Sequence, residues 1–168
     1  MLEKLKTLFT NFPGVEADKV LPTVGLNIGR FEAYGSPLVF WDLGGQAGLR
    51  SIWDKYYGES HALMFVVDAS DKHRIEEAKA CMDKALGNRE LYGAPLLVLA
   101  NKQDVAGSVA ACDVAEQLEI GSIEARPCNV QSVSAISGDG LKAAVQWLVE
   151  RVRKSQRAEL LRHKVLMT

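Results

Sequence analysis

Residues 95–104 read Pro-Leu-Leu-Val-Leu-Ala-Asn-Lys-Gln-Asp, an apolar run that ends in four polar side chains. A short, continuous apolar run of this kind is typical of a β-strand that is covered on both faces. Residues 62–67, Ala-Leu-Met-Phe-Val-Val, form a second such run, and a helical pattern over Arg74–Leu86 separates the two. Buried strands that alternate with helices indicate an α/β domain with a mostly parallel sheet.

The alternation continues after residue 104. The spacing predicts a helix over Val109–Leu118, a weaker strand over Asn129–Val133, and a last helix that begins near Asp139 or Gly140. This last helix carries an apolar stripe that is expected to face the core. The stripe consists of Leu141, Ala144, Val145, Leu148, Val149 and Val152.

The first 41 residues follow a different pattern. Leu2–Phe9 reads as a helix with one apolar face, and Asn11–Pro22 reads as a loop. Strands are predicted over Leu26–Tyr34 and Leu38–Trp41, with a turn at Gly35–Pro37, so that the two strands form a hairpin. The chain opens inside a helix, whereas a parallel α/β domain usually has its first strand in the middle of the sheet, so we expect that strand to be missing.

Composition excludes several classes of protein. A chain of 168 residues with 48% hydrophobic and 24% charged residues fits one globular domain. The net charge of −1 gives no indication of nucleic-acid binding, and no apolar run reaches the roughly 20 residues of a membrane span. The three cysteines, Cys81, Cys112 and Cys128, are too widely spaced for a zinc site or a disulfide framework, which favours a reducing compartment.

Basic residues gather only near the C-terminus, and we expect a domain over residues 1–157 followed by a basic tail over residues 158–168. They can be a solvated helix end, which the helix macrodipole favours, or a contact with a membrane surface or a partner. The cluster consists of Arg151, Arg153, Lys154, Arg157, Arg162 and Lys164.

Asn101, Lys102 and Asp104 follow a buried strand, at the sheet edge where open α/β folds bind ligands. A carboxylate at Asp104 can accept two hydrogen bonds from guanine, whereas adenine has no matching donor pair. The Lys102 stem can lie along a purine face, and the Asn101 amide can tie neighbouring loops together. The alternative is a polar turn after a core strand.

A second polar segment follows the predicted hairpin, Trp-Asp-Leu-Gly-Gly-Gln at residues 41–46. Asp42 can hold a Mg²⁺-bound water, Gly45 can offer its N–H to a γ-phosphate, and Gln46 can orient an attacking water. Upstream, the hydroxyl of Thr23 can reach Mg²⁺ when a γ-phosphate orders the loop. The alternatives are a Gly-rich turn and an ordinary Pro-Thr loop.

Ser134 and Ala135 follow the last predicted strand, where a tight turn can bring the Ala135 N–H to a purine carbonyl. The alternative is a helix entry built from turn residues. All these motifs lie at or beside strand ends in one order along the chain, so their joint chance occurrence is far less probable than that of any single motif.

With these motifs, the chain resembles the Arf family of small GTPases, in its Arf-related branch. The resemblance rests on Pro22–Asn27, on residues 41–46, and on residues 49–57, Leu-Arg-Ser-Ile-Trp-Asp-Lys-Tyr-Tyr. It implies the small-GTPase α/β fold, with a mostly parallel sheet and helices on both faces. It also implies GTP and GDP as ligands, Mg²⁺ as cofactor, and hydrolysis of GTP in a switch of Golgi vesicle traffic.

The resemblance assigns a role to each motif residue. Thr23 would bind Mg²⁺ with Asp42 behind it, Gln46 would be catalytic, and the hairpin would slide between nucleotide states. Trp41 and Tyr56 match two of three effector-binding aromatics, with Leu26 at the third position. The residues that would bind GTP are Asp42, Gly44, Gly45, Gln46, Asn101, Lys102, Asp104, Ser134 and Ala135.

One family motif has no match, since G-x-x-x-x-G-K-[ST] occurs nowhere in residues 1–168. This loop holds the β- and γ-phosphates and supplies a Mg²⁺ ligand. We expect its loss, together with the preceding strand, to open a slot in the sheet. The uncapped helix at Leu2 suggests that Met1 is an internal residue of a longer protein.

Two functions follow as alternatives. The first is a GTP-hydrolysing switch, cytoplasmic and Golgi-associated, monomeric, which does not bind nucleic acid and is served by Arf-type exchange factors, activating proteins and effectors. The second is a nucleotide-free pseudo-GTPase that binds partners through its hairpin. An unrelated enzyme has little support, because His61, His73 and His163 form no catalytic or metal-binding spacing.

Overall fold

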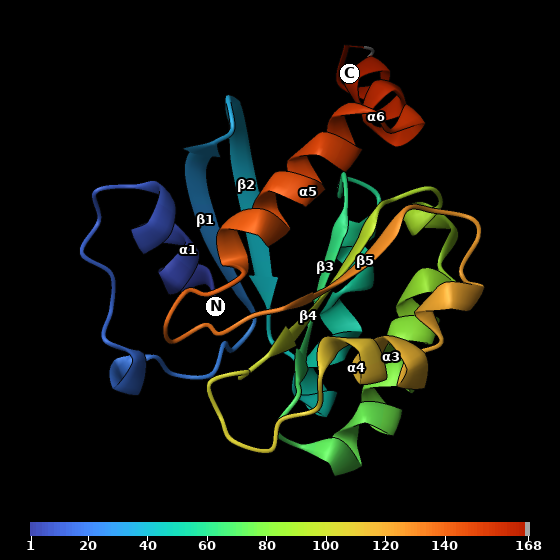
Figure 1. Ribbon diagram of the computed structural model, residues 1–168. Coiled ribbons are helices and arrows are strands. Elements are labelled where there is room, and N and C mark those ends of the chain that lie inside the picture. Colours follow the sequence, from blue (N-terminus) through green and yellow to red (C-terminus); the bar gives the residue numbers. More distant parts are fainter. Residues whose placement is uncertain (167–168) are drawn as a thin grey trace. The chain divides into compact units, whose positions relative to one another are not determined.

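The computed structural model describes residues 1–166, which divide into two compact units (Figure 1). The N-terminal unit comprises Met1–Tyr56, and the C-terminal unit begins at Tyr57. The hydrogen-bonded strands likewise form two separate sheets, β1–β2 and β3–β4–β5, and within residues 1–166 no strand joins them. In chain order, the first strand of the described residues is β1 (Leu26–Ala33).

The N-terminal unit is built on an antiparallel hairpin. Strand β1 (Leu26–Ala33) pairs with β2 (Ser36–Leu43) in a register that runs from Leu26 opposite Leu43 to Ala33 opposite Ser36. The predicted turn at Gly35–Pro37 is wrong, because Ser36 and Pro37 belong to β2. The turn is Tyr34-Gly35, with φ of 52° and 65°. Two consecutive positive φ values match the twist of the strands in a two-residue hairpin.

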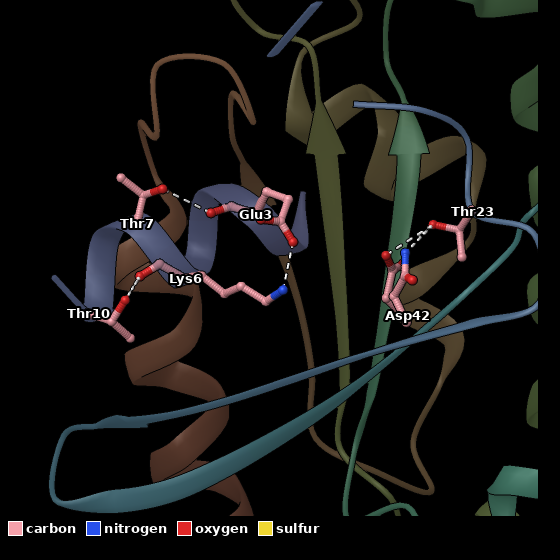
Figure 2. Close-up of polar contacts among 7 residues, drawn as sticks. Glu3, Lys6, Thr7, Thr10, Thr23 and Asp42 are labelled. Carbon is pink, nitrogen blue, oxygen red and sulfur yellow. Dashed lines mark hydrogen bonds and ion pairs between the residues drawn. The ribbon is translucent and has the colours of Figure 1, made fainter. Parts of the chain in front are cut away.

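Helix α1 (Leu2–Phe9) covers one face of this hairpin, as its apolar face predicts. A Cβ at Gly29 would lie 2.5 Å from a methyl carbon of Leu2, so glycine is what allows the helix to come this close. The Phe9 ring stacks on Phe31 at 5.5 Å between ring centres. On the surface of this helix, Lys6 forms an ion pair with Glu3 at 2.6 Å. Figure 2 shows this pair together with other hydrogen bonds of the helix.

The C-terminal unit is built on a parallel sheet of three strands in the order β3–β4–β5. These are β3 (Leu63–Asp68), β4 (Leu96–Asn101) and β5 (Cys128–Ser132). Residues 96–100 of β4 are fully buried, which confirms the strand predicted from the apolar run. The register pairs Asp68 with Asn101 and Ala100 with Ser132, so the three carboxyl ends lie at one edge.

Helices cover both faces of this sheet: α3 (Ile75–Leu86) and α4 (Ala111–Gln117) lie on one side and α5 (Leu141–Arg153) on the other (Figure 1). Helix α4 starts later than predicted, because the backbone of Ala110 is extended, with ψ of 153°, and the Val109 N–H before it donates to the Ala69 carbonyl at 2.8 Å. The predicted stripe of α5 is buried from Leu141 to Val149.

A further helix, α6 (Gln156–Leu166), includes the part of the predicted basic tail that the structure describes; residues 167 and 168 lie outside it. The Arg157 guanidinium anchors α6 by donating to the carbonyls of Tyr57, Ser60 and Tyr92, at 2.7, 2.6 and 3.2 Å. Among the described residues no helix is long and apolar enough to span a membrane. The short helices are η1 (Ala17–Lys19), η2 (Ala47–Ile52), α2 (Asp54–Tyr57), η3 (Lys72–Arg74), η4 (Arg89–Leu91) and η5 (Ile120–Ser122).

Candidate functional site

The carboxyl end of β4 and the loop after β5 meet through two residues that the sequence singled out. Asn101 is the last residue of β4, and its Oδ1 accepts a hydrogen bond from the Ala135 N–H at 2.9 Å. These residues are 34 positions apart, and parallel pairing of the strands brings them together. Asn101 thus ties the two loops to each other.

Asp104 is held by Ser134, the one polar residue classed as buried in the described chain, with 2% of its surface exposed. The Ser134 hydroxyl donates to Asp104 Oδ1 at 2.5 Å. Ser134 Oγ also accepts from the N–H groups of Ile136 and Ser137, at 3.2 and 3.1 Å. This arrangement fixes the carboxylate of Asp104, which stays exposed and can accept hydrogen bonds from the donors of a ligand.

Lys102 has a left-handed backbone, with φ of 68°, and its ammonium pairs with Asp68 Oδ2 at 2.6 Å. The other Asp68 oxygen accepts from the N–H and the hydroxyl of Ser70, at 3.0 and 2.6 Å. Partial burial would raise the pKa of Asp68, but the hydrogen bonds from Lys102 and Ser70 outweigh it and hold that pKa below its ordinary value.

Asn101, Lys102, Asp104, Ser134 and Ala135, called here the base-reading cluster, are the residues to which the sequence analysis assigned a guanine ring. The cluster offers a fixed carboxylate, a lysine stem and an ordered loop at one sheet edge. The structure places Ala135 differently from the expected role, because its N–H already donates to Asn101. A purine carbonyl would have to share or replace that bond.

In the N-terminal unit, Thr23 and Asp42 lie side by side (Figure 2). The Thr23 hydroxyl donates to Asp42 Oδ2 at 3.2 Å and accepts from the Asn27 amide at 3.3 Å. A hydroxyl and a carboxylate are oxygen ligands of the kind that Mg²⁺ prefers. Among the described residues no group of three or more His, Cys, Asp or Glu could hold a metal, so this pair fits an ion that takes its remaining ligands from water or phosphate.

Gly44 and Gly45 differ sharply in their surroundings. A Cβ at Gly44 would lie 2.5 Å from the Thr23 carbonyl oxygen, so only glycine allows this approach, and the Gly44 N–H donates to the Gly25 carbonyl at 3.1 Å. A Cβ at Gly45 would meet nothing within 4 Å. Gly45 therefore leaves open space in which a phosphate group can approach the backbone.

Arg50 and Trp53 hold these glycines in place. The Arg50 side chain donates to the Gly45 carbonyl at 2.8 Å, and the Trp53 indole N–H donates to the Gly44 carbonyl at 3.0 Å. Gln46 directly precedes η2 and is exposed. Because the Gly44 and Gly45 carbonyls both accept hydrogen bonds, the peptide groups of these glycines are fixed in orientation. The Gln46 side chain, in contrast, is exposed to solvent.

The outer face of the hairpin carries an apolar patch at one end, at Leu26, Ile28 and Trp41. The Trp41 and Tyr56 rings lie 5.6 Å apart, and Trp41 is opposite Ile28 in the β1–β2 register. Leu26 lies on the same face as Ile28, because the two residues are two positions apart on one strand. The structure thus brings together all the residues that the family resemblance assigns to an effector surface.

Sequence reasoning missed Asp68, Ser70 and Asn27. Asp68 ends β3 as Asn101 ends β4, and Ser70 lies two residues further on, so the rule that carboxyl ends of parallel strands share an edge identifies them. Asn27 belongs to β1, and its side-chain amide donates to the Thr23 hydroxyl. No local sequence pattern predicts this hydrogen bond, because it depends on the path of the loop before β1.

Comparisons with known proteins show the family of the chain. The model of the ADP-ribosylation factor family matches residues 5–152. Human ADP-ribosylation factor-related protein 1 is 41% identical over 154 residues, which cover 90% of this chain and 77% of that protein. ADP-ribosylation factor-like protein 3 of Chlamydomonas reinhardtii is 38% identical over 134 residues, or 80% of this chain and 76% of that protein.

A solved structure extends the likeness to three dimensions. The Arl6 BBS3 small GTPase of Trypanosoma brucei, with the nucleotide analogue GppNp bound, matches with a TM-score of 0.80 and 26% identity. The match covers 92% of this chain and 91% of that chain. It confirms the predicted α/β fold, and the sequence matches confirm the predicted family. The chain belongs to the ADP-ribosylation factor family of small GTPases.

Proposed function

We propose that this protein is a guanine-nucleotide switch that binds GTP and hydrolyses it to GDP. The observation that carries the proposal is the Asp104 carboxylate, fixed by the buried Ser134 hydroxyl at 2.5 Å beside the Asn101–Ala135 bond. A carboxylate held in this way accepts from the N1–H and amino groups of guanine without first having to be ordered.

Asp104 gives the site its preference for guanine over adenine, because adenine presents an acceptor where guanine presents a donor. A carboxylate facing that acceptor would be left without a partner, which a hydrogen-bonding site penalises strongly. Lys102 places its stem beside the ring, and Asn101 keeps the loop after β5 against β4.

In the N-terminal unit, Thr23 would bind Mg²⁺ and Asp42 would hold a water on that ion, which when bound neutralises charge on the phosphates. The Gly45 N–H donates to a terminal phosphate oxygen, and the absence of a Cβ leaves the approach clear. Gln46 orients the water that attacks this phosphate. Arg50 and Trp53 keep the glycine segment in place while Gln46 remains free to adjust.

The partners would be of the Arf type: an exchange factor, an activating protein that supplies an arginine, and effectors that bind the Trp41–Tyr56 face. The hairpin would shift its register between the GDP and GTP states. We place the protein in the cytoplasm and at Golgi membranes in vesicle traffic, as a monomer that does not bind nucleic acid. The family membership and the Trp41–Tyr56 ring contact support these roles.

A second candidate is a nucleotide-free interaction module. Two features favour it. The Ala135 N–H and the Lys102 ammonium already have protein partners, and residues 1–168 contain no G-x-x-x-x-G-K-[ST] stretch. The hairpin face would then bind its partners without regulation by nucleotide.

Calorimetric titration of the 168-residue chain separates the two candidates. The switch predicts that GTP and GDP bind with Mg²⁺ present and that ATP does not. Protein that binds none of the three, and whose absorbance at 260 nm shows no co-purified nucleotide, would reject the switch and favour the interaction module.

A further inference from the structure

Asp68 contacts the Lys102 side chain of the base-reading cluster but belongs to none of the predicted motifs. Its Oδ2 lies 2.6 Å from the Lys102 ammonium, and the pair joins the carboxyl ends of two neighbouring strands, β3 and β4. Ser70 holds the other Asp68 oxygen by two hydrogen bonds. The carboxylate is therefore fixed before it meets Lys102.

The backbone of Lys102 is fixed as well. Its φ of 68° is unusual for a residue with a side chain, and its carbonyl accepts from the Ser108 hydroxyl at 2.8 Å and the Val105 N–H at 3.0 Å. Since the Cα end and the ammonium end are both held, the aliphatic stem between them has little rotamer freedom left. The methylene groups of Lys102 therefore form an apolar surface in a fixed position at the carboxyl edge of the sheet.

We propose that Asp68 is a positioning residue of the base-reading cluster, which holds the Lys102 stem in place as the surface on which a purine ring lies. The inference rests on the proposed guanine-nucleotide binding and assigns part of it to a residue outside the motifs. Asp68 acts through Lys102 and does not touch the base.

A purely stabilising role and a ligand-attracting role for the Asp68–Lys102 pair both fit less well. A role in stability alone is weak, because both side chains are substantially exposed, at 37% and 49%, and exposed pairs contribute little to folding. A role of Asp68 in attracting the ligand has the wrong sign, because a carboxylate repels an anionic nucleotide. A role in positioning Lys102 remains for Asp68, whose carboxylate contacts the Lys102 ammonium and the N–H and hydroxyl groups of Ser70.

The two possible roles of Asp68 predict opposite changes in nucleotide affinity when its charge is removed. Removing a carboxylate near an anion should tighten binding, whereas losing the position of Lys102 should weaken it. We therefore expect Asp68→Asn to weaken GDP binding by roughly threefold to fivefold, in the range of a partly exposed ion pair. The matched control is Asp71→Asn, which removes the same charge three positions away, from a side chain that makes no capping bond.

A double-mutant cycle with Lys102→Met shows whether Asp68 acts through the lysine. Methionine keeps an apolar stem without the ammonium, so Asp68→Asn should cause no further loss of GDP affinity in that background. Calorimetry gives the affinities for GDP, and the guanine-over-adenine ratio, measured against ADP, should stay unchanged in Asp68→Asn because Asp104 reads the base.

Each outcome decides a different claim. Equal GDP affinity in the parent, Asp68→Asn and Asp71→Asn, or additive losses in the cycle, would overturn the role of Asp68 and leave the proposed function standing. A parent protein that binds no GDP would overturn both. The NMR signal of the Lys102 side-chain ammonium should broaden and shift in Asp68→Asn without ligand, because the protons lose their partner and exchange faster with water; an unchanged signal would count against the pair.

Discussion

The base-reading cluster and Thr23, at the start of the Thr23–Gln46 segment, differ in how firmly the fold holds them. In the cluster, Asp104 is tied to a buried hydroxyl at 2.5 Å and Asn101 to a backbone N–H at 2.9 Å. In the segment, the Thr23 bonds are longer, at 3.2 and 3.3 Å, and the neighbouring Val24 is 82% exposed. A site that recognises an unchanging base can be rigid, whereas a segment that responds to the terminal phosphate must be able to move.

The largest expected effect tests the rigid region directly. Asp104→Asn replaces a pure acceptor with a group that both accepts and donates, so the preference for GTP over ATP should fall by about 100-fold. Competition between the two nucleotides measures the ratio. Asp113→Asn, an exposed aspartate on α4, is the control. An unchanged ratio in Asp104→Asn would remove Asp104 from base reading.

The next effect separates the two glycines of the Thr23–Gln46 segment. Gly44→Ala should lower the free energy of unfolding by about 2 kcal/mol, because the new Cβ would crowd the Thr23 carbonyl. Gly45→Ala should change it by less than about 0.5 kcal/mol, because its Cβ meets open space.

Urea denaturation of both variants gives the stabilities, and titration with GTP and GDP gives the affinities. Gly45→Ala should weaken GTP binding more than GDP binding, because only GTP brings a phosphate to the Gly45 N–H. Equal unfolding free energies for the two variants would contradict the difference in packing around the two glycines, and equal losses for GTP and GDP would contradict the role of Gly45.

A smaller loss of stability is expected from Ser134→Ala. The change leaves the Ile136 and Ser137 N–H groups without their acceptor and frees Asp104, which should cost about 1.5 kcal/mol. The exposed Ser132→Ala is the control. If Ser134→Ala and Ser132→Ala unfold at the same urea concentration, the rigid region does not depend on this hydroxyl.

The smallest effect concerns the pKa of Asp68. Ser70→Ala removes the hydroxyl hydrogen bond that favours the charged carboxylate and keeps the one from the backbone N–H, so the pKa of Asp68 should rise part of the way toward its ordinary value of 3.8. Because the folded pKa is lowered, the stabilisation exists above the ordinary value and is lost as the pH falls through the folded pKa. A carboxyl NMR titration measures this shift, and an unchanged pKa in Ser70→Ala would show that the Ser70 hydroxyl does not hold Asp68.

The sequence predicted the elements whose pattern is local. Strand β4 follows from an uninterrupted apolar run, and α1 and α5 follow from apolar residues on one helical face. The hairpin turn was misplaced because Pro37 is a common turn residue, yet it lies on β2 opposite Glu32 while Tyr34 adopts the positive φ.

The motif residues were predictable as candidates, but their partners were not. Ser134 was expected to bind nucleotide, and its burial and its three hydrogen bonds appear only in the folded chain. The Asp68–Lys102 pair depends on the register of two parallel strands, which no local pattern specifies. Side-chain contacts between different strands therefore cannot be predicted from this sequence alone.

The central claim is that the base-reading cluster recognises guanine, and an NMR titration of the ¹⁵N-labelled protein tests it most directly. If the cluster reads guanine, GDP shifts the backbone amides of residues 101–104 and 134–137, and ADP at the same concentration leaves them in place. Shifts that are the same for both nucleotides, or no shift with either, would contradict it.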